Sequence, residues 1–351
     1  MAYASELALK LVPYTAGEQP KDRKIIKLNT NENPYPPSPE VEKAIAGLAP
    51  QLRLYPDMEA TGVREAIADY LGLTSDRVFC GNGSDEVLAF AFAAFFAGKQ
   101  VISPDISYSF YPVYASLFGA KLTQVPLRED FTVDVAAMQK GLPIVLANPN
   151  APTSLALQNS SLRELAEHTR SHGEILLVDE AYAEFARENA VSLLEEFDNL
   201  LIVRTFSKSH GLAGMRVGFA VGSPELIGYL RRVRDSFNSY PLDRLAQAAA
   251  EAAMRDSGYM REQCEKIIDS RDWAIRKLRE NGVTVLDSQT NFLFVKADET
   301  DASGIQKSLR EAGILVRHFK AGRLNPYLRI SIGTQEEMEQ VVDKLLSLIR
   351  K

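Results

Sequence analysis

Short apolar runs alternate with helix-like segments along the first two thirds of the chain. The clearest runs are LPIVLANPN, EILLVDEAY and NLLIVRTFS, each about as long as one strand. Their apolar positions follow one another almost without interruption, which is typical of strands covered on both faces, as in a parallel sheet. Segments such as SSLRELAEHTRSHG carry apolar residues three and four positions apart and predict the intervening helices. This alternation predicts a doubly wound α/β domain.

The pattern changes in the last third of the chain. A long stretch, EAAMRDSGYMREQCEKIIDSRDWAIRKLRENG, predicts one helix that ends near Gly282. The strand-like segments TNFLFVKAD, GILVRHF and LRISIGT follow, with helices between and after them, which predicts a smaller α+β domain. We therefore expect three parts: residues 1–40, irregular and packed with the small domain; a large domain over residues 41–254; and the small domain over residues 255–351.

Composition and charge limit the classes of partner that we expect the protein to bind. The chain has 351 residues, of which 46% are apolar and 25% charged, and its net charge is −6 without a basic block. We therefore expect no nucleic-acid partner. Cys80 and Cys264 do not make a disulfide framework. The N-terminus lacks a signal-peptide pattern, and the longest apolar run, VLAFAFAAFFA, is too short to span a bilayer. These features predict a cytoplasmic protein that does not bind membranes.

Candidate chemistry gathers where the predicted strands end. Ligands of doubly wound sheets bind beyond the carboxyl ends of the strands. Asp179 ends one apolar run, Lys208 follows the next, and the turn GNGSDE opens a predicted helix. We expect one crevice to be faced by Ser84, Asp85, Tyr108, Asp179, Tyr182, Ser207 and Lys208.

These residue types suit pyridoxal 5′-phosphate. Its aldehyde needs a lysine amine, its pyridine nitrogen needs an acid partner, and its phosphate needs N–H donors and positive charge. Lys208 offers the amine and Asp179 the acid. The GNGS turn offers backbone N–H groups at a helix start, to which Ser207 and Arg216 add a hydroxyl and a guanidinium. Taken singly, Lys208 reads as a solvated lysine and Asp179 as a helix cap, so it is their combination that favours the cofactor.

Several motifs together carry a family resemblance. VDEAY, RTFSKSHGLAGMRVGF and GNGSDE, with NTNENPYPPSP before them, resemble the fold-type-I, aspartate-aminotransferase-like enzymes that use pyridoxal phosphate. Within that group the chain is most similar to the histidinol-phosphate aminotransferases, through PYTAGEQP and the segment after it. The resemblance implies a large α/β domain with a mostly parallel mixed sheet and helices on both faces, plus a smaller α+β domain.

The resemblance also implies roles for individual residues. Lys208, Asp179 and Tyr182 would be catalytic: the Schiff-base lysine and proton carrier, the partner of the pyridine nitrogen, and the partner of the ring oxygen. Tyr108 would stack on the ring. The phosphate would be held by Ser84, Asp85, Ser207 and Arg216, and by Tyr55 of a neighbouring subunit, which implies a homodimer. Arg329 would bind the anionic group of the substrate, and Arg317 would be a second contact to it.

One segment departs from the family pattern. Where the family often reads N-P-N-N-P-T-G, this chain reads NPNAPTS, so Ala151 stands where an asparagine normally contacts the ring oxygen. Either Tyr182 serves that oxygen alone, or Asn150 shifts to help. The change from glycine to Ser154 has no explanation in the sequence.

The resulting functional expectation is a transaminase. It would move an amino group between L-histidinol phosphate and 2-oxoglutarate, giving imidazole acetol phosphate and L-glutamate, in histidine biosynthesis. Two alternatives on the same fold stay open: an aromatic-amino-acid aminotransferase and a phosphothreonine decarboxylase. His168 and His172 share a helix face but lack a third ligand, so we expect no metal site there. His210, near Lys208, is interpreted as local support.

Overall fold

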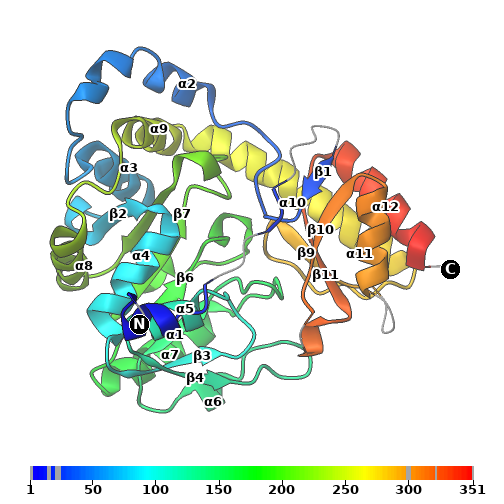
Figure 1. Cartoon of the computed structure of the whole chain (residues 1–351), viewed down its shortest axis with the longest axis horizontal. Helices are drawn as coiled ribbons and strands as arrows, with labels where there is room; N and C mark the ends of the chain where they lie inside the picture. Colours follow the sequence, from blue (N-terminus) through cyan, green and yellow to red (C-terminus); the bar gives the residue numbers. More distant parts are fainter. Residues whose placement is uncertain (1–2, 14–16, 20–24, 298–301, 321, 350–351) are drawn as a thin grey trace.

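A computed structural model describes residues 3–13, 17–19, 25–297, 302–320 and 322–349. Part of the PYTAGEQP segment therefore lies outside the described residues. Figure 1 shows a large domain and a smaller one, joined along the helix α10 (Ser257–Glu280). Among the described residues, no helix is both long and apolar enough to cross a membrane.

The large domain is built on a seven-stranded mixed sheet, as the apolar runs predicted. From edge to edge its strands are β2 (Val78–Asn82), β8 (Val217–Val221), β7 (Leu200–Thr205), β6 (Leu176–Asp179), β5 (Ile144–Ala147), β3 (Gln100–Pro104) and β4 (Lys121–Val125). All neighbouring pairs from β7 to β4 are parallel, whereas β8 is antiparallel to both β7 and β2. The carboxyl ends of β6 and β7 therefore meet at one edge of the sheet.

Helices cover both faces of this sheet, which explains why its strands are apolar throughout. On one face, Leu176 and Val178 pack with α3 (Thr61–Leu71), α7 (Asn159–Ser171) and α9 (Arg244–Arg255). On the other face, Leu177 packs with three further helices: α4 (Gly83–Ala91), α5 (Tyr111–Leu117) and α8 (Pro224–Phe237). Successive strand residues thus face opposite cores, as the period of a strand requires. The short α6 (Val135–Met138) adds Met138 to the first core.

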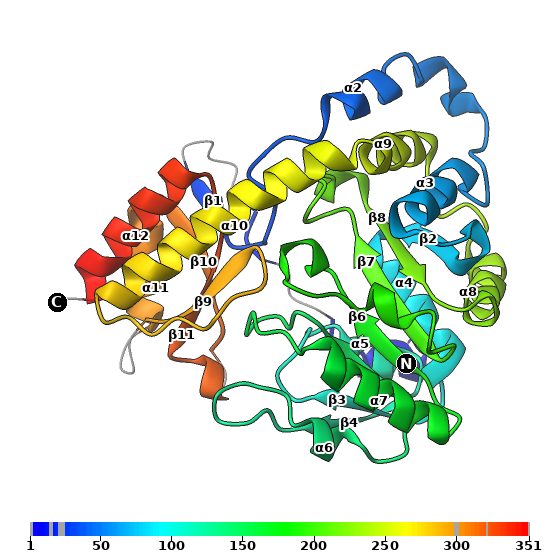
Figure 2. The ribbon, with the colours of Figure 1, turned by 180° about the vertical axis from the view of Figure 1, so that it is seen from behind.

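The small domain has a four-stranded sheet of its own. The strand order is β1 (Ile26–Leu28), β10 (Ile314–His318), β11 (Tyr327–Ser331) and β9 (Phe292–Lys296). Side chains of α10, α11 (Ala302–Glu311) and α12 (Gln335–Ile349) form one apolar cluster with it. Figure 2 shows α11 and α12 on the side of the sheet that faces away from the large domain, with α10 running from there to α9.

Two sequence expectations differ from the structure. Residues 1–40 do not pack as one piece: β1 joins the small sheet, whereas both views place α1 (Glu6–Lys10) on the large-domain side. The long C-terminal helical stretch is also divided, because the helix is interrupted at Asp256, between α9 and α10.

Candidate active site

The ends of β6 and β7 open into a small cavity. Asp179 is the last residue of β6 and lies opposite Val203 of β7, after which Ser207 and Lys208 follow. The cavity has a volume of about 110 Å³. Its predicted lining residues are Ser84, Asp85, Tyr108, Asp179, Tyr182, Ser207, Lys208 and Arg216, and Ala147, Ala151, Ala181 and Thr205 complete it. The sheet topology therefore brings residues from five separate parts of the sequence, within 84–85, 108, 147–151, 179–182 and 205–216, to one point.

Lys208 presents an unusually weakly basic amine. Its Nζ donates a hydrogen bond to the carbonyl oxygen of Thr30, 3.3 Å away. Loss of hydration, with the nearby Arg329 guanidinium as the next cause, lowers the pKa of Lys208 from 10.5 to about 8. A substantial fraction of the amine is therefore neutral slightly above pH 7, as a nucleophile or a general base requires.

Asp179 is a buried acid with two hydrogen-bond donors. Its side chain is 5% exposed. The hydroxyl of Tyr111 donates to Oδ2 at 3.1 Å, and the backbone amide of Ala181 donates to Oδ1 at 3.2 Å. Burial raises the pKa of Asp179 to about 7, and these two hydrogen bonds oppose the rise. A positive charge beside this carboxyl group would therefore be strongly favoured, and a protonated pyridine nitrogen is such a charge.

Tyr182 is held from the N-terminal segment. The side-chain amide of Asn31 donates to the Tyr182 hydroxyl at 2.9 Å. Asn31 is itself fixed, because its side-chain oxygen accepts from the Ser331 hydroxyl at 2.9 Å and its carbonyl accepts from Asn291 at 3.1 Å. The ring of Tyr182 also meets the Phe292 ring edge-on, with centroids 5.1 Å apart. The phenol oxygen at the cavity wall is thus fixed by contacts with the small domain.

The turn between β2 and α4 has the form of an anion cradle. Helix α4 begins at Gly83, whose φ is 78°, and Ser84 and Asp85 lie in the first helical turn, where N–H groups lack partners within the helix. Arg216 reaches this turn: its Nη2 donates to the Asp85 carboxylate at 2.9 Å, and its Nη1 to the Ser207 hydroxyl at 3.5 Å. N–H groups, a hydroxyl and a guanidinium therefore converge, as a phosphate group needs.

The close approach in this cradle depends on Gly218 of β8. A Cβ atom added there would lie 2.2 Å from the backbone nitrogen of Ser84. Only glycine lets the strand and the start of α4 lie so close together.

Tyr108 forms one wall of the cavity. Its hydroxyl donates to the second oxygen of Asp85 at 2.7 Å, and its ring meets the Tyr111 ring edge-on at 5.7 Å. Burial, the first cause, and the Asp85 carboxylate raise the pKa of Tyr108, so its phenol stays protonated. A flat apolar face at this position fits the expected stacking on an aromatic ring.

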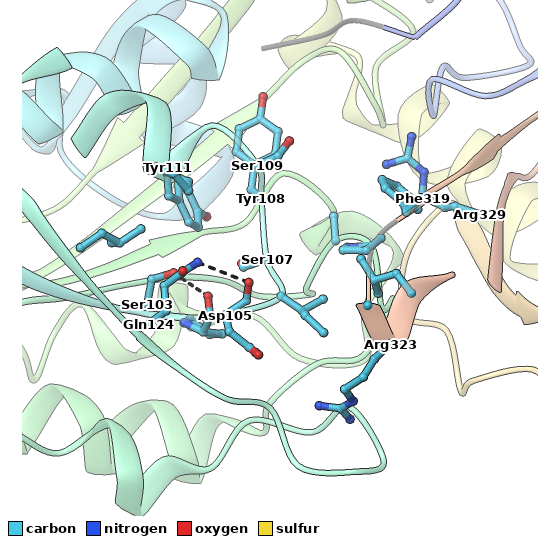
Figure 3. Close-up of a pocket in the computed structure, with 18 of the residues that line it drawn as sticks. Ser103, Asp105, Ser107, Tyr108, Ser109, Tyr111, Gln124, Phe319, Arg323 and Arg329 are labelled. Carbon is cyan, nitrogen blue, oxygen red and sulfur yellow. Dashed lines mark hydrogen bonds between the residues drawn. The ribbon is translucent and has the colours of Figure 1, made fainter. Parts of the chain in front are cut away.

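A second, larger cavity adjoins the first. Its volume is about 570 Å³, and Tyr108 and Ala151 line both cavities. Figure 3 shows Ser107, Tyr108 and Tyr111 of the large domain on one side, with Phe319 and Arg329 of the small domain on the other. Arg317 also lines this cavity.

Two of these arginines lie directly opposite each other. Arg317 of β10 pairs with Arg329 of β11 in the antiparallel register. Two positive charges side by side attract an anion that binds between or beside them. The planar guanidinium group can bind either a carboxylate or a phosphate through two hydrogen bonds. This end of the cleft is therefore suited to an anionic substrate group.

Tyr55 lies away from both cavities of its own chain. Its side chain is 80% exposed, and it lines neither cavity. Its ring stacks on Tyr240 at 4.8 Å, and its carbonyl accepts a hydrogen bond from Arg244 at 2.8 Å. A contact with the phosphate of its own site does not occur in this arrangement.

The departing NPNAPTS segment has a defined conformation. Asn150 is buried and turned away from the first cavity: its amide donates to the Ile106 carbonyl at 3.0 Å and to the Thr153 hydroxyl at 2.9 Å. The hypothesis that Asn150 shifts toward the ring oxygen therefore loses support. Ala151 lines the cavity, and Ser154 has a φ of 67°, in the left-handed region that favours glycine. Nothing in the structure explains why serine stands there.

Three functional candidates were absent from the sequence prediction: Asn31, Tyr111 and Thr205. Thr205 stands two positions before Ser207 at a strand end, so the two side chains share a face. Tyr111 stands three positions after Tyr108 where a helix starts, which also places them on one side. Spacing could therefore have indicated both Thr205 and Tyr111. Asn31 gave no such signal, because it meets Tyr182 across 151 positions. His210 is neutral, since burial lowers its pKa to about 4.

Comparisons with known proteins agree with this geometry. Residues 23–345 match the family described as "Aminotransferase class I and II". The chain belongs to the class I and II aminotransferases. Histidinol-phosphate aminotransferases of Clostridium botulinum (strain Langeland) and Acinetobacter baumannii (strain SDF) are 46% and 47% identical to it. The alignments cover 99% of both chains for the first, and 98% of this chain and 97% of the relative for the second.

A solved structure of the same kind is similar over the whole chain. The histidinol-phosphate aminotransferase of Sinorhizobium meliloti in complex with pyridoxal-5′-phosphate superposes with a TM-score of 0.87 at 28% identity. The superposition covers 100% of this chain and 98% of the other. This aminotransferase therefore has the fold and the cofactor class that its motifs predicted.

The described residues fit pyridoxal phosphate. The cavity contains an amine of low pKa and a buried acid that lacks a counter-charge, and beside them lies a cradle that a single Cβ atom would block. These features match the aldehyde, the ring nitrogen and the phosphate in turn.

Proposed function

We propose that this aminotransferase moves an amino group between L-histidinol phosphate and 2-oxoglutarate, giving imidazole acetol phosphate and L-glutamate, in histidine biosynthesis. The observation that carries the proposal is the position of Lys208 and Asp179 in one cavity, with the opposed Arg317–Arg329 pair in the adjoining one. One anion site can then serve the phosphate ester and the dicarboxylate alike.

The proposed chemistry assigns a task to each group. When bound, pyridoxal phosphate supplies an aldehyde that takes up amino groups and a ring that accepts electrons. Lys208 Nζ takes the proton from Cα of the amino donor, a task that suits its lowered pKa. The Asp179 carboxylate supplies the negative charge that a protonated pyridine nitrogen needs. Tyr182 and Tyr108 orient the reacting groups. Ser84, Ser207, Arg216 and the backbone amide of Asp85 hold the phosphate.

The proposed site is completed by a second copy of the chain. Tyr55 is exposed and stacked on Tyr240, away from its own cavities, so it is available to a neighbouring subunit. Other apolar side chains exposed on the same and adjacent segments support a homodimer: Leu52, Leu54 and Phe237. We also propose that the protein has no nucleic-acid or membrane partner and lies in the cytoplasm. The two free, buried cysteines support this location, because a reducing compartment keeps thiols free.

A substrate survey tests the proposed function. The cofactor-loaded protein is mixed separately with histidinol phosphate, phenylalanine and phosphothreonine, and its visible absorbance and products are followed. Rapid spectral change with histidinol phosphate, and glutamate formation once 2-oxoglutarate is added, is the expected result. Faster transfer from phenylalanine would instead identify an aromatic-amino-acid aminotransferase. Release of CO₂ from phosphothreonine without amino transfer would identify a decarboxylase.

A further inference from the structure

In the described part of the chain, the Tyr111 hydroxyl donates a side-chain hydrogen bond to the Asp179 carboxyl group. Tyr111 is the first residue of α5, its side chain is 1% exposed, and its Oη lies 3.1 Å from Asp179 Oδ2. The other carboxylate oxygen accepts from the Ala181 amide. Each oxygen of Asp179 therefore has one donor, which fixes the plane of the carboxyl group inside the cavity.

The Tyr111 hydroxyl is held in place by surrounding rings. Phe92 stacks on the Tyr111 ring with centroids 6.3 Å apart and an interplanar angle of 26°. Tyr108 meets the ring edge-on, at an interplanar angle of 84°. A buried ring packed on two sides has little rotational freedom, so its oxygen is a fixed donor.

The Tyr111 hydroxyl opposes the influences that favour the protonated form of Asp179. Burial disfavours the charged carboxylate, as do the negative charges of Asp85 and Glu180. A phenol that donates to the carboxylate favours the charged form. Without it, a proton shared between Asp179 and a pyridine nitrogen would move toward the carboxyl group.

We propose that Tyr111 is a positioning residue that keeps Asp179 ionised and aimed at the pyridine nitrogen of the cofactor. The proposal rests on the proposed function only through the cofactor. Its test needs no substrate, so its failure is distinguishable from the failure of the substrate assignment.

The test compares two tyrosines of the same helix. Tyr111→Phe removes one oxygen and keeps the ring. Tyr114→Phe is the matched control, because Tyr114 lies one turn further along α5, is 5% exposed, and its hydroxyl has no hydrogen-bond partner in the described part of the chain. The readouts are the dissociation constant of pyridoxal phosphate and the absorbance spectrum of the loaded protein.

For Tyr111→Phe we expect cofactor binding about 10-fold weaker or more, since a hydrogen bond to a charged group is lost, with a shifted absorbance band. Tyr114→Phe should bind the cofactor like the parent. Equal affinities and spectra for the two variants would overturn the proposal.

A double-mutant cycle separates an effect of Tyr111 through Asp179 from a general loss of packing. In an Asp179→Asn background no carboxylate remains to be held, so adding Tyr111→Phe should change the cofactor dissociation constant by less than about 2-fold. A full 10-fold loss in that background would show that Tyr111 acts without Asp179, and would overturn the proposal too.

Discussion

At the residue scale, Asp179 shows how a site can lower stability in order to bind its ligand. In the described part of the chain, this buried carboxyl group accepts hydrogen bonds from Tyr111 and Ala181, neither of which is a cation. Burial raises its pKa from 3.8 to about 7. Between about pH 4 and pH 7, the folded, cofactor-free protein therefore holds a proton on Asp179 that the unfolded chain has already released. The contribution of this group to the free energy of unfolding falls as the pH rises through that window.

Asp179→Asn should remove this pH dependence. We expect the cofactor-free variant to gain stability relative to the parent as the pH rises from 4 to 7, by an amount on the order of a few kcal/mol. Urea unfolding at several pH values measures the difference, and the titration of His210 cancels because both proteins contain it. Parallel pH profiles for the two proteins would contradict the assignment. With pyridoxal phosphate present, the order should reverse, because the variant loses the acid partner of the ring nitrogen.

At the element scale, the site depends on how closely β8 approaches the start of α4. Gly218 lies in a buried strand paired on both sides, and its Cα faces the backbone of Gly83 and Ser84. Neither partner can move without disturbing the sheet or the turn that begins α4.

Gly218→Ala should therefore separate the strand from the helix start. We expect a loss of about 3 kcal/mol in the free energy of unfolding, because backbone atoms cannot relax as side chains do. Cofactor affinity should fall as well. Gly228→Ala in α8 is the control, since its added Cβ would meet nothing within 4 Å, and it should stabilise the helix by about 0.5–1 kcal/mol. Urea unfolding and cofactor titration separate the two outcomes, and equal stability of the variants would refute the packing argument.

The β10–β11 pair carries a second prediction at this scale. Arg329→Lys keeps the charge opposite Arg317 but loses the planar fork of donors. We expect KM for both histidinol phosphate and 2-oxoglutarate to rise about 10-fold or more, corresponding to one charged hydrogen bond. Arg276→Lys, on an exposed position of α10, should leave both constants unchanged. Normal KM values for both substrates in Arg329→Lys would refute the idea of one shared anion site.

At the scale of the whole molecule, the cleft lies between two domains that also touch beyond it. Phe131 of the large domain meets the rings of Phe294 and Tyr327 edge-on, at 5.9 and 5.3 Å. Arg323 of the small domain lies over the Phe131 ring at 4.6 Å and donates to the carbonyl of Leu127 at 2.9 Å. These contacts join the small domain, which contains Arg317 and Arg329, to the large domain that carries Lys208.

Subunit complementation tests the proposed homodimer. If Tyr55 acts in the partner's site, each site takes Lys208 from one subunit and Tyr55 from the other. Tyr55→Ala and Lys208→Ala then remove residues that different subunits contribute. A mixed dimer then contains one native site and one doubly altered site. Coexpression of the two variants should restore about a quarter of the native activity, because half of the dimers are mixed. Activity no higher than that of the separate variants would contradict the sharing of sites, and sedimentation measurements would show whether dimers form at all.

The sequence alone determined the local part of this protein. Apolar runs without alternation required a sheet covered on both faces, and the polar residues that end those runs had to meet at its carboxyl edge, which placed Asp179 and Lys208 together. Strand period and strand-end position are properties of adjacent residues, so they can be read along the chain.

Only the tertiary structure decided the contacts that depend on how the chain closes on itself. It brought Asn31 to Tyr182, aligned Arg317 with Arg329, and left Tyr55 outside its own site. It also divided the N-terminal segment between the domains and broke the long helix at Asp256. These outcomes depend on strand register and domain packing, which are set by many weak contacts between distant residues rather than by any short motif.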